Sequence, residues 1–169
     1  MTAGPRIAAF FDTPTNTVSY LVSDPETRAA AVIDPVLGFD AASGIIDSAP
    51  ADGILAAAAE QDLEVLVVLE THPHADHLTG APAIKSRTGA KVGIGVGIRE
   101  VQKTFGPMFG ADDLKSDAGD FDLLLQDGQQ LALGNLTIEV IATPGHTPAC
   151  VSYRIGDAVF VGDTLFMPD

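Results

Sequence analysis

Cysteine and basic residues are scarce in this chain, and tryptophan is absent. The single cysteine, Cys150, excludes an intrachain disulfide framework and fits a reducing compartment. The chain has 9 Lys and Arg against 23 Asp and Glu, which gives a formal net charge of -14. Because a field of that sign repels phosphate backbones and anionic lipids, we expect neither nucleic acid nor a membrane as a partner.

Long apolar runs are also missing. The densest stretches, Ile54–Ala59 and Val65–Leu69, are far shorter than the ~20 residues that a membrane-spanning helix needs. Met1–Thr17 contains one basic residue and is interrupted by two prolines, so it does not have the pattern of a secretory signal. We therefore expect a cytoplasmic protein.

The composition is otherwise that of a folded protein. Hydrophobic residues make up 46% and charged residues 19% of the 169 positions, which excludes the disordered class. The length predicts one domain over residues 1–169.

The order of predicted elements favours a mixed α/β layered fold, because strands occur at both ends and strands alternate with helices in the middle. The predicted strands are Ile7–Phe11, Thr17–Ser23, Ala29–Ile33, Glu64–Leu69, Lys91–Ile94, Gln129–Leu133, Leu136–Ala142, Cys150–Ile155 and Ala158–Val161. The predicted helices are Asp52–Gln61, Leu78–Arg87, which Gly89 ends, and Ile98–Phe105. Two segments are predicted to be loops, Phe39–Pro50 and the acidic Asp112–Asp122.

All four histidines lie in two short segments that follow predicted strands. His72, His74 and His77 occur within Thr71–His77, and His146 occurs within Thr143–Thr147. Scattered surface histidines would not group in this way, and strand ends are where α/β proteins usually present their sites. We interpret the two groups as parts of one metal site, since imidazole is a ligand for both zinc and iron.

The spacing within the first group indicates two points of convergence. Pro73 favours an extended backbone before it, so His72 and His74 point to the same side. Asp76 and His77 follow where a helix would begin and can face a second point nearby.

Asp163, in a Gly-Asp-Thr turn after the last predicted strand, supplies a candidate carboxylate for a set with His72 and His146. Two histidines and one carboxylate form the facial triad of non-heme Fe(II) enzymes, but this spacing does not distinguish it from a zinc hydrolase site. We interpret Asp34 as a turn-capping residue and Cys150 as a small buried hydrophobe.

These motifs resemble the metal motifs of the metallo-β-lactamase superfamily. Thr71–His77 is similar to its His-x-His-x-Asp-His signature, and Thr143–Thr147 and Gly162–Phe166 are similar to the next two motifs, in the same order. The resemblance implies an αββα sandwich with the metal at the open edge between two sheets. Within the superfamily the chain most resembles the glutathione-persulfide dioxygenase branch, through Ile33–Val36, Pro148–Tyr153 and the segment from Val161 onward.

Members of that branch use one iron to oxidise a glutathione-bound persulfide with O2 to sulfite and glutathione. The resemblance therefore implies Fe(II) bound by His72, His146 and Asp163, with a small-molecule persulfide and O2 as partners. His74, Asp76 and His77 would line the catalytic pocket; in hydrolase relatives they complete a two-zinc site, with Asp76 and His77 as second-metal ligands. Members of the branch also continue well past the position of Asp169, so we expect the domain to be incomplete at its C-terminus and a homo-oligomer to be possible.

Two alternatives stay open. One is a thioester hydrolase of the glyoxalase II type, or another metallo-hydrolase, in which zinc would generate a hydroxide nucleophile. The other is a metal-binding fragment without catalytic activity. Metal analysis combined with oxygen uptake distinguishes the three.

Overall fold

The computed structural model describes residues 3–111 and 116–166 of the chain. The strands are β1 (Arg6–Asp12), β2 (Thr17–Ser23), β3 (Ala29–Ile33), β4 (Val36–Asp40), β5 (Ile45–Asp47), β6 (Glu64–Leu69), β7 (Leu78–Thr79), β8 (Lys91–Gly95), β9 (Leu123–Leu125), β10 (Gln130–Leu133), β11 (Leu136–Ala142), β12 (Val151–Ile155) and β13 (Ala158–Phe160). The helices are α1 (Ala49–Glu60), α2 (Ala81–Thr88), α3 (Ile98–Met108) and the 3-10 helix η1 (Gly162–Thr164).

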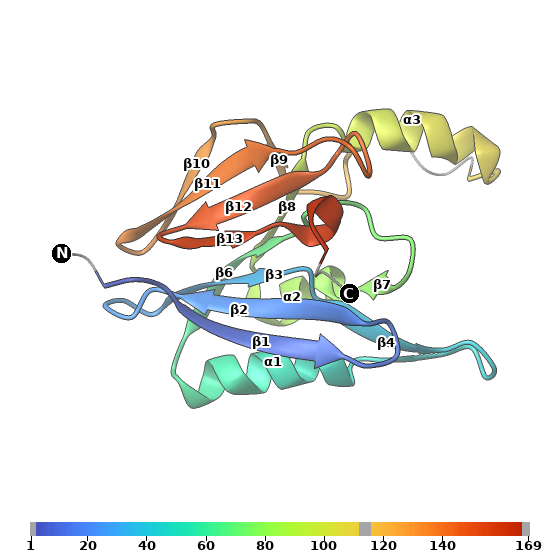
Figure 1. Ribbon diagram of the computed structural model, residues 1–169. Helices are drawn as coiled ribbons and strands as arrows, with labels where there is room; N and C mark the ends of the chain where they lie inside the picture. The colour runs from blue at the N-terminus through green and yellow to red at the C-terminus, as the bar shows by residue number, and fades with distance from the viewer. Residues whose placement is uncertain (1–2, 112–115, 167–169) are drawn as a thin grey trace.

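Two main sheets organise the molecule. The larger sheet has the order β1-β2-β3-β6-β8-β9; its first three strands are antiparallel, and β3, β6, β8 and β9 run parallel. The second sheet is an antiparallel β10-β11-β12-β13 meander. The two sheets lie face to face, and α1 and α2 lie on the outer side of the larger one (Figure 1). A small β5-β4-β7 sheet extends to one side.

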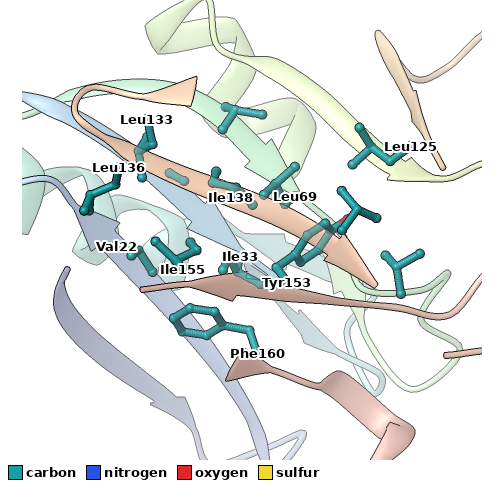
Figure 2. Packing of buried hydrophobic residues seen from close by; sticks show 14 of the residues in the cluster. Val22, Ile33, Leu69, Leu125, Leu133, Leu136, Ile138, Tyr153, Ile155 and Phe160 are labelled. Atoms are coloured by element: carbon teal, nitrogen blue, oxygen red, sulfur yellow. The ribbon is translucent and has the colours of Figure 1, made fainter. Parts of the chain in front are cut away.

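The main core fills the space between the two sheets. Alternating residues of the second sheet point inward, and they meet the inner face of the larger sheet. Figure 2 shows Ile138, Tyr153 and Ile155 facing Ile33 and Leu69 across this space. The outer face of the second sheet is more polar and carries an ion pair between Arg154 and Glu139.

A second core lies between the larger sheet and its two helices. Helix α1 buries Ala51, Ile54 and Ala58, whose spacing of three and four residues places them on one face. They pack against β3 residues such as Ala30 and Val32, which point away from the first core. The larger sheet is therefore buried on both faces, as its parallel strands require.

The segment predicted to be the loop Phe39–Pro50 is instead structured. It contains the end of β4, all of β5 and the start of α1. Its turn is stabilised by the Asp40 carboxylate, which accepts hydrogen bonds from the backbone N–H groups of Ala42 and Ser43, and by Gly44 with φ +72°. The sequence prediction failed here because the pairing is a short hairpin whose apolar residues Phe39, Ile45 and Ile46 stay exposed rather than marking a buried face.

The predicted helix Leu78–Arg87 begins later than expected. Leu78 and Thr79 form β7 against β4, and α2 starts at Ala81 with a proline in its first turn. The helix ends at Gly89, which has the left-handed φ of +76°, as predicted. The predicted hairpins at the C-terminal end of the chain are confirmed.

Irregular structure is confirmed over 116–122, while 112–115 of the predicted acidic loop lie outside the described residues. Among the residues that are described, none of the helices has the length and hydropathy required to cross a membrane.

Candidate metal centre

The candidate ligands come from three loops at one end of the sandwich. His72, His74, Asp76 and His77 follow β6, His146 follows β11, and Asp163 lies in η1 after β13. The strands bring together segments that are up to 91 residues apart in sequence (Figure 1).

His72, His146 and Asp163 converge on one point. One ligand atom from each lies within 4.8 Å of the other two. Asp163 Oδ2 is 3.6 Å from His146 Nε2 and 3.9 Å from His72 Nε2. His72 is buried, whereas His146 and Asp163 are partly open to solvent, so this cluster is accessible from one side.

A hydrogen-bond chain orients the His72 ring. The Thr71 hydroxyl donates to Asp34 Oδ2 at 2.8 Å, so its oxygen is left to accept from His72 Nδ1 at 3.0 Å. The Nε2 lone pair of His72 then faces Asp163 and His146. Burial, together with the neighbouring His74 charge, lowers the pKa of His72 to about 4. His72 is thus a neutral imidazole with the tautomer that a metal ligand needs.

Close backbone packing positions the other two members of this cluster. Gly162 has φ +48°, and a Cβ atom there would collide with the Thr71 side chain, so only glycine lets Asp163 approach His72. Gly97, between β8 and α3, lies against the backbone of Pro148. A Cβ at Gly97 would displace the loop that carries His146.

His74 lies deeper than the other candidate ligands and contacts two carboxylates. Its Nε2 is 3.2 Å from Asp34 Oδ1 and 3.2 Å from Glu70 Oε2. Burial alone would lower the pKa of His74, but the hydrogen bonds to Asp34 and Glu70 outweigh it and raise the pKa to about 10. In the absence of metal, His74 is therefore an imidazolium over the physiological pH range.

A second group of potential ligand atoms belongs to His74, Asp76 and His77. His77 Nδ1 lies 3.1 Å from the carbonyl oxygen of Leu78, to which it can donate, and His77 Nε2 is buried without a hydrogen-bond partner. A ring whose Nδ1–H is held by a backbone carbonyl and whose Nε2 is unpartnered has the arrangement of a metal-binding histidine. The donor sets therefore fit a metal ion, with imidazole and carboxylate ligands that suit iron and zinc alike.

A trough of about 540 Å3 leads to this centre. Asp76 and Asp163 line this trough, together with residues of the β1–β2 turn. Phe160, Leu165 and Phe166 also line it. A small molecule entering here would meet apolar and hydroxyl-bearing side chains before it reached the candidate ligands.

Two residues at this site, Asp34 and Glu70, were not recognised from the sequence as parts of it. Asp34, interpreted as a turn-capping residue, accepts hydrogen bonds from the N–H and hydroxyl of Thr71 and contacts His74. Glu70 contacts the same Nε2 atom of His74. The only sequence signal for Asp34 and Glu70 was an acidic residue directly after a buried strand.

The fold and the convergent histidine and aspartate side chains define an α/β sandwich protein with a candidate metal centre. The model of the metallo-β-lactamase superfamily matches residues 12–169, and the chain belongs to this family. Both the expected family and the expected fold are thereby confirmed.

Several relatives are similar over nearly the whole chain. The beta-lactamase hydrolase-like protein of Agrobacterium fabrum is 46% identical over 99% of this chain and 39% of its own length. Glyoxylase B2 of Dictyostelium discoideum is 42% identical over 97% of this chain and 57% of its own. Human persulfide dioxygenase ETHE1 is 32% identical over 93% of this chain and 51% of its own.

The crystal structure of ETHE1 from Myxococcus xanthus superimposes with a TM-score of 0.75 at 33% identity, over 96% of this chain and 59% of that one. The chain thus spans between about two fifths and three fifths of the length of these relatives.

Proposed function

We propose that the protein is an iron-dependent persulfide dioxygenase, which oxidises glutathione persulfide with O2 to sulfite and glutathione. The observation that carries this proposal is the convergence of His72, His146 and Asp163, the last of which lines an open trough. Two histidines and one carboxylate that leave coordination positions free suit Fe(II) and a reaction with O2. The similarity to human and Myxococcus xanthus ETHE1 supports the same assignment.

Each side chain at the metal centre has a distinct role in the proposed reaction. His72, His146 and Asp163 would hold the iron, and the iron, when bound, supplies the activation of O2. The trough, which is lined by the β1–β2 turn and by Phe160, Leu165 and Phe166, would admit the persulfide. Asp76 is exposed within the same trough, so its carboxylate is placed to accept the proton of an incoming persulfide. His74 and His77 belong to the same loop, in which His74 contacts Asp34 and Glu70.

The proposed reaction balances without a further oxidant. The terminal sulfur of the persulfide is oxidised, O2 is reduced, and the sulfur–sulfur bond breaks. Water supplies the third oxygen of sulfite, and glutathione leaves as the thiol. The scarcity of cysteine supports a cytoplasmic location for this chemistry.

The direct test is to load the full chain with Fe(II) without oxygen and to follow O2 consumption and sulfite release with glutathione persulfide. We expect one iron per chain and O2 uptake that depends on the persulfide. Iron-loaded protein that consumes no O2 with the persulfide, under conditions where an ETHE1 relative does, would contradict the proposal.

A second candidate is a metallo-hydrolase acting on a thioester. The observation in its favour is the unpartnered Nε2 of His77, which with Asp76 offers ligands for a second metal. The similarity to Glyoxylase B2 of Dictyostelium discoideum agrees with it. Two zinc ions per chain, together with cleavage of a glutathione thioester and no oxygen uptake, would favour this reaction over the dioxygenase.

A further inference from the structure

Glu70 is a buried acid that neither proposed reaction uses. It directly follows β6, and only 3% of its surface is exposed. Its Oε1 accepts a hydrogen bond from the Thr79 hydroxyl, and its Oε2 lies 3.2 Å from His74 Nε2. Among the described residues Oε2 has no hydrogen-bond partner, so the charge contact with His74 is what compensates this oxygen for its lost solvation.

The contact with Thr79 closes the loop that carries the histidine signature. Glu70 precedes this loop and Thr79 follows it, so their hydrogen bond joins the two ends of residues 71–78. The same Thr79 oxygen accepts the backbone N–H of Ala81, the first residue of α2. The end of β6 and the start of α2 are thus connected through one hydroxyl group.

The contact with His74 acts at the centre of the loop. The His74 ring lies between two others, with its centroid 4.1 Å from that of His72 and 4.2 Å from that of His77. A rotation of His74 would therefore displace a ring on each side. Asp34 and Glu70 hold its Nε2 from two directions and prevent that rotation.

The space behind the loop makes this restraint necessary. A cavity of about 180 Å3 is lined by Glu70, His74 and His77, with Ile94 and Phe121 among its apolar neighbours. Packing alone therefore does not fill the space behind the histidines, and unfilled space leaves side chains free to turn. The hydrogen bond from Thr79 and the close charge contact with His74 let Glu70 supply the restraint that packing lacks.

We propose that Glu70 is a positioning residue of the metal centre. It closes the loop through Thr79 and fixes His74, and through His74 it sets the orientation of His72 and His77. The role rests on the proposed function only in requiring a metal at this centre, and it applies to the one-metal and two-metal reactions alike. Outer partners of metal-bound histidines commonly change metal affinity by about 10–100-fold when removed.

The test measures Co(II) binding by the full chain through competition with a chelator, together with the visible absorption of the bound Co(II). The variants are Glu70→Ala, Glu70→Gln and Thr79→Val. The matched control is Glu64→Ala, which removes an exposed glutamate from the other end of the same strand. Circular dichroism establishes that each variant is folded.

We expect Glu70→Ala to weaken Co(II) binding by about 10–100-fold and to shift the absorption bands, while Glu64→Ala matches the parent. Glu70→Gln should fall between them, because its amide oxygen still accepts from Thr79 but the negative charge beside His74 is lost. Thr79→Val should also weaken Co(II) binding. If Glu70→Ala does not fold, the Co(II) affinity of Thr79→Val tests the positioning role in its place.

Glu70→Ala or Thr79→Val with the affinity and absorption spectrum of the parent would overturn the positioning role, even if thermal stability fell. The Glu70 variants could weaken Co(II) binding while the iron-loaded parent consumes no O2 with the persulfide. That combination would contradict the dioxygenase proposal and leave the positioning role of Glu70 standing.

Discussion

Replacing Thr71 by valine should damage both the stability and the metal affinity of this protein. The change keeps the shape of the side chain but removes its hydroxyl, which donates to Asp34 at 2.8 Å and accepts from His72 at 3.0 Å. Both partners are buried and would be left without this contact. The bond to the carboxylate is worth about 1.5–3 kcal/mol and the bond to the imidazole about 0.5–1.5 kcal/mol.

The expected loss is therefore about 2–4 kcal/mol in the free energy of unfolding, a large share of the 5–15 kcal/mol typical of a folded domain. Urea unfolding in the presence of a chelator measures this loss without the contribution of bound metal. Metal affinity should fall by about 10–100-fold as well, because His72 loses the contact that sets its tautomer.

Thr71→Ser is the matched control. It retains the hydroxyl and removes one methyl group, which costs about 1 kcal/mol. A valine variant that unfolds at the urea concentration of the parent and binds metal equally well would contradict the role assigned to the Thr71 hydroxyl. A serine variant that loses as much metal affinity as the valine variant would also contradict it, because packing rather than hydrogen bonding would then orient His72.

Three further predictions test other parts of the site and fold. Asp163→Ala should remove nearly all bound metal and Asp76→Ala little of it, as measured by elemental analysis; equal losses from a parent with two metals would favour the hydrolase. Gly97→Ala should weaken metal binding more than Gly145→Ala, because only the first Cβ would meet backbone atoms; equal affinities would disprove the packing argument. The backbone N–H of Asn135, in the β10–β11 turn, lowers the pKa of the Asp24 carboxyl group. The stability that this carboxyl group contributes is therefore present above its unfolded-state pKa, and it is lost as the pH falls through the folded-state pKa. Urea unfolding of Asp24→Asn should therefore show a weaker loss of stability on acidification than the parent, and parallel pH profiles would contradict this.

The position of Asp34 beside Glu70 explains why part of the site escaped prediction. Strands β3 and β6 are parallel, and Ile33 pairs with Leu69, so the two acids that follow these strands lie side by side. The register shifts by one residue between Ala30 and Ala31, where β6 contains a bulge at Leu66. Without that bulge, Asp34 would lie beside Leu69 rather than Glu70. No local pattern in the sequence indicates such a shift, because it depends on how two distant strands pack.

The sequence by itself predicted most of the longer strands and helices and a metal site as a hypothesis. Strands at both ends and strand–helix alternation in the middle predicted a mixed α/β layered fold, since these patterns depend on neighbours along the chain, and the resemblance to the metallo-β-lactamase superfamily implied the two-sheet sandwich. The grouping of His72–His77 and His146 after strands likewise indicated a metal site without knowledge of the contacts. Only the tertiary structure decided how the side chains are held: the carboxylates that orient His72 and His74, and the glycines that allow close approach. Those contacts join residues dozens of positions apart, and their geometry exists only once strand register and sheet packing are set.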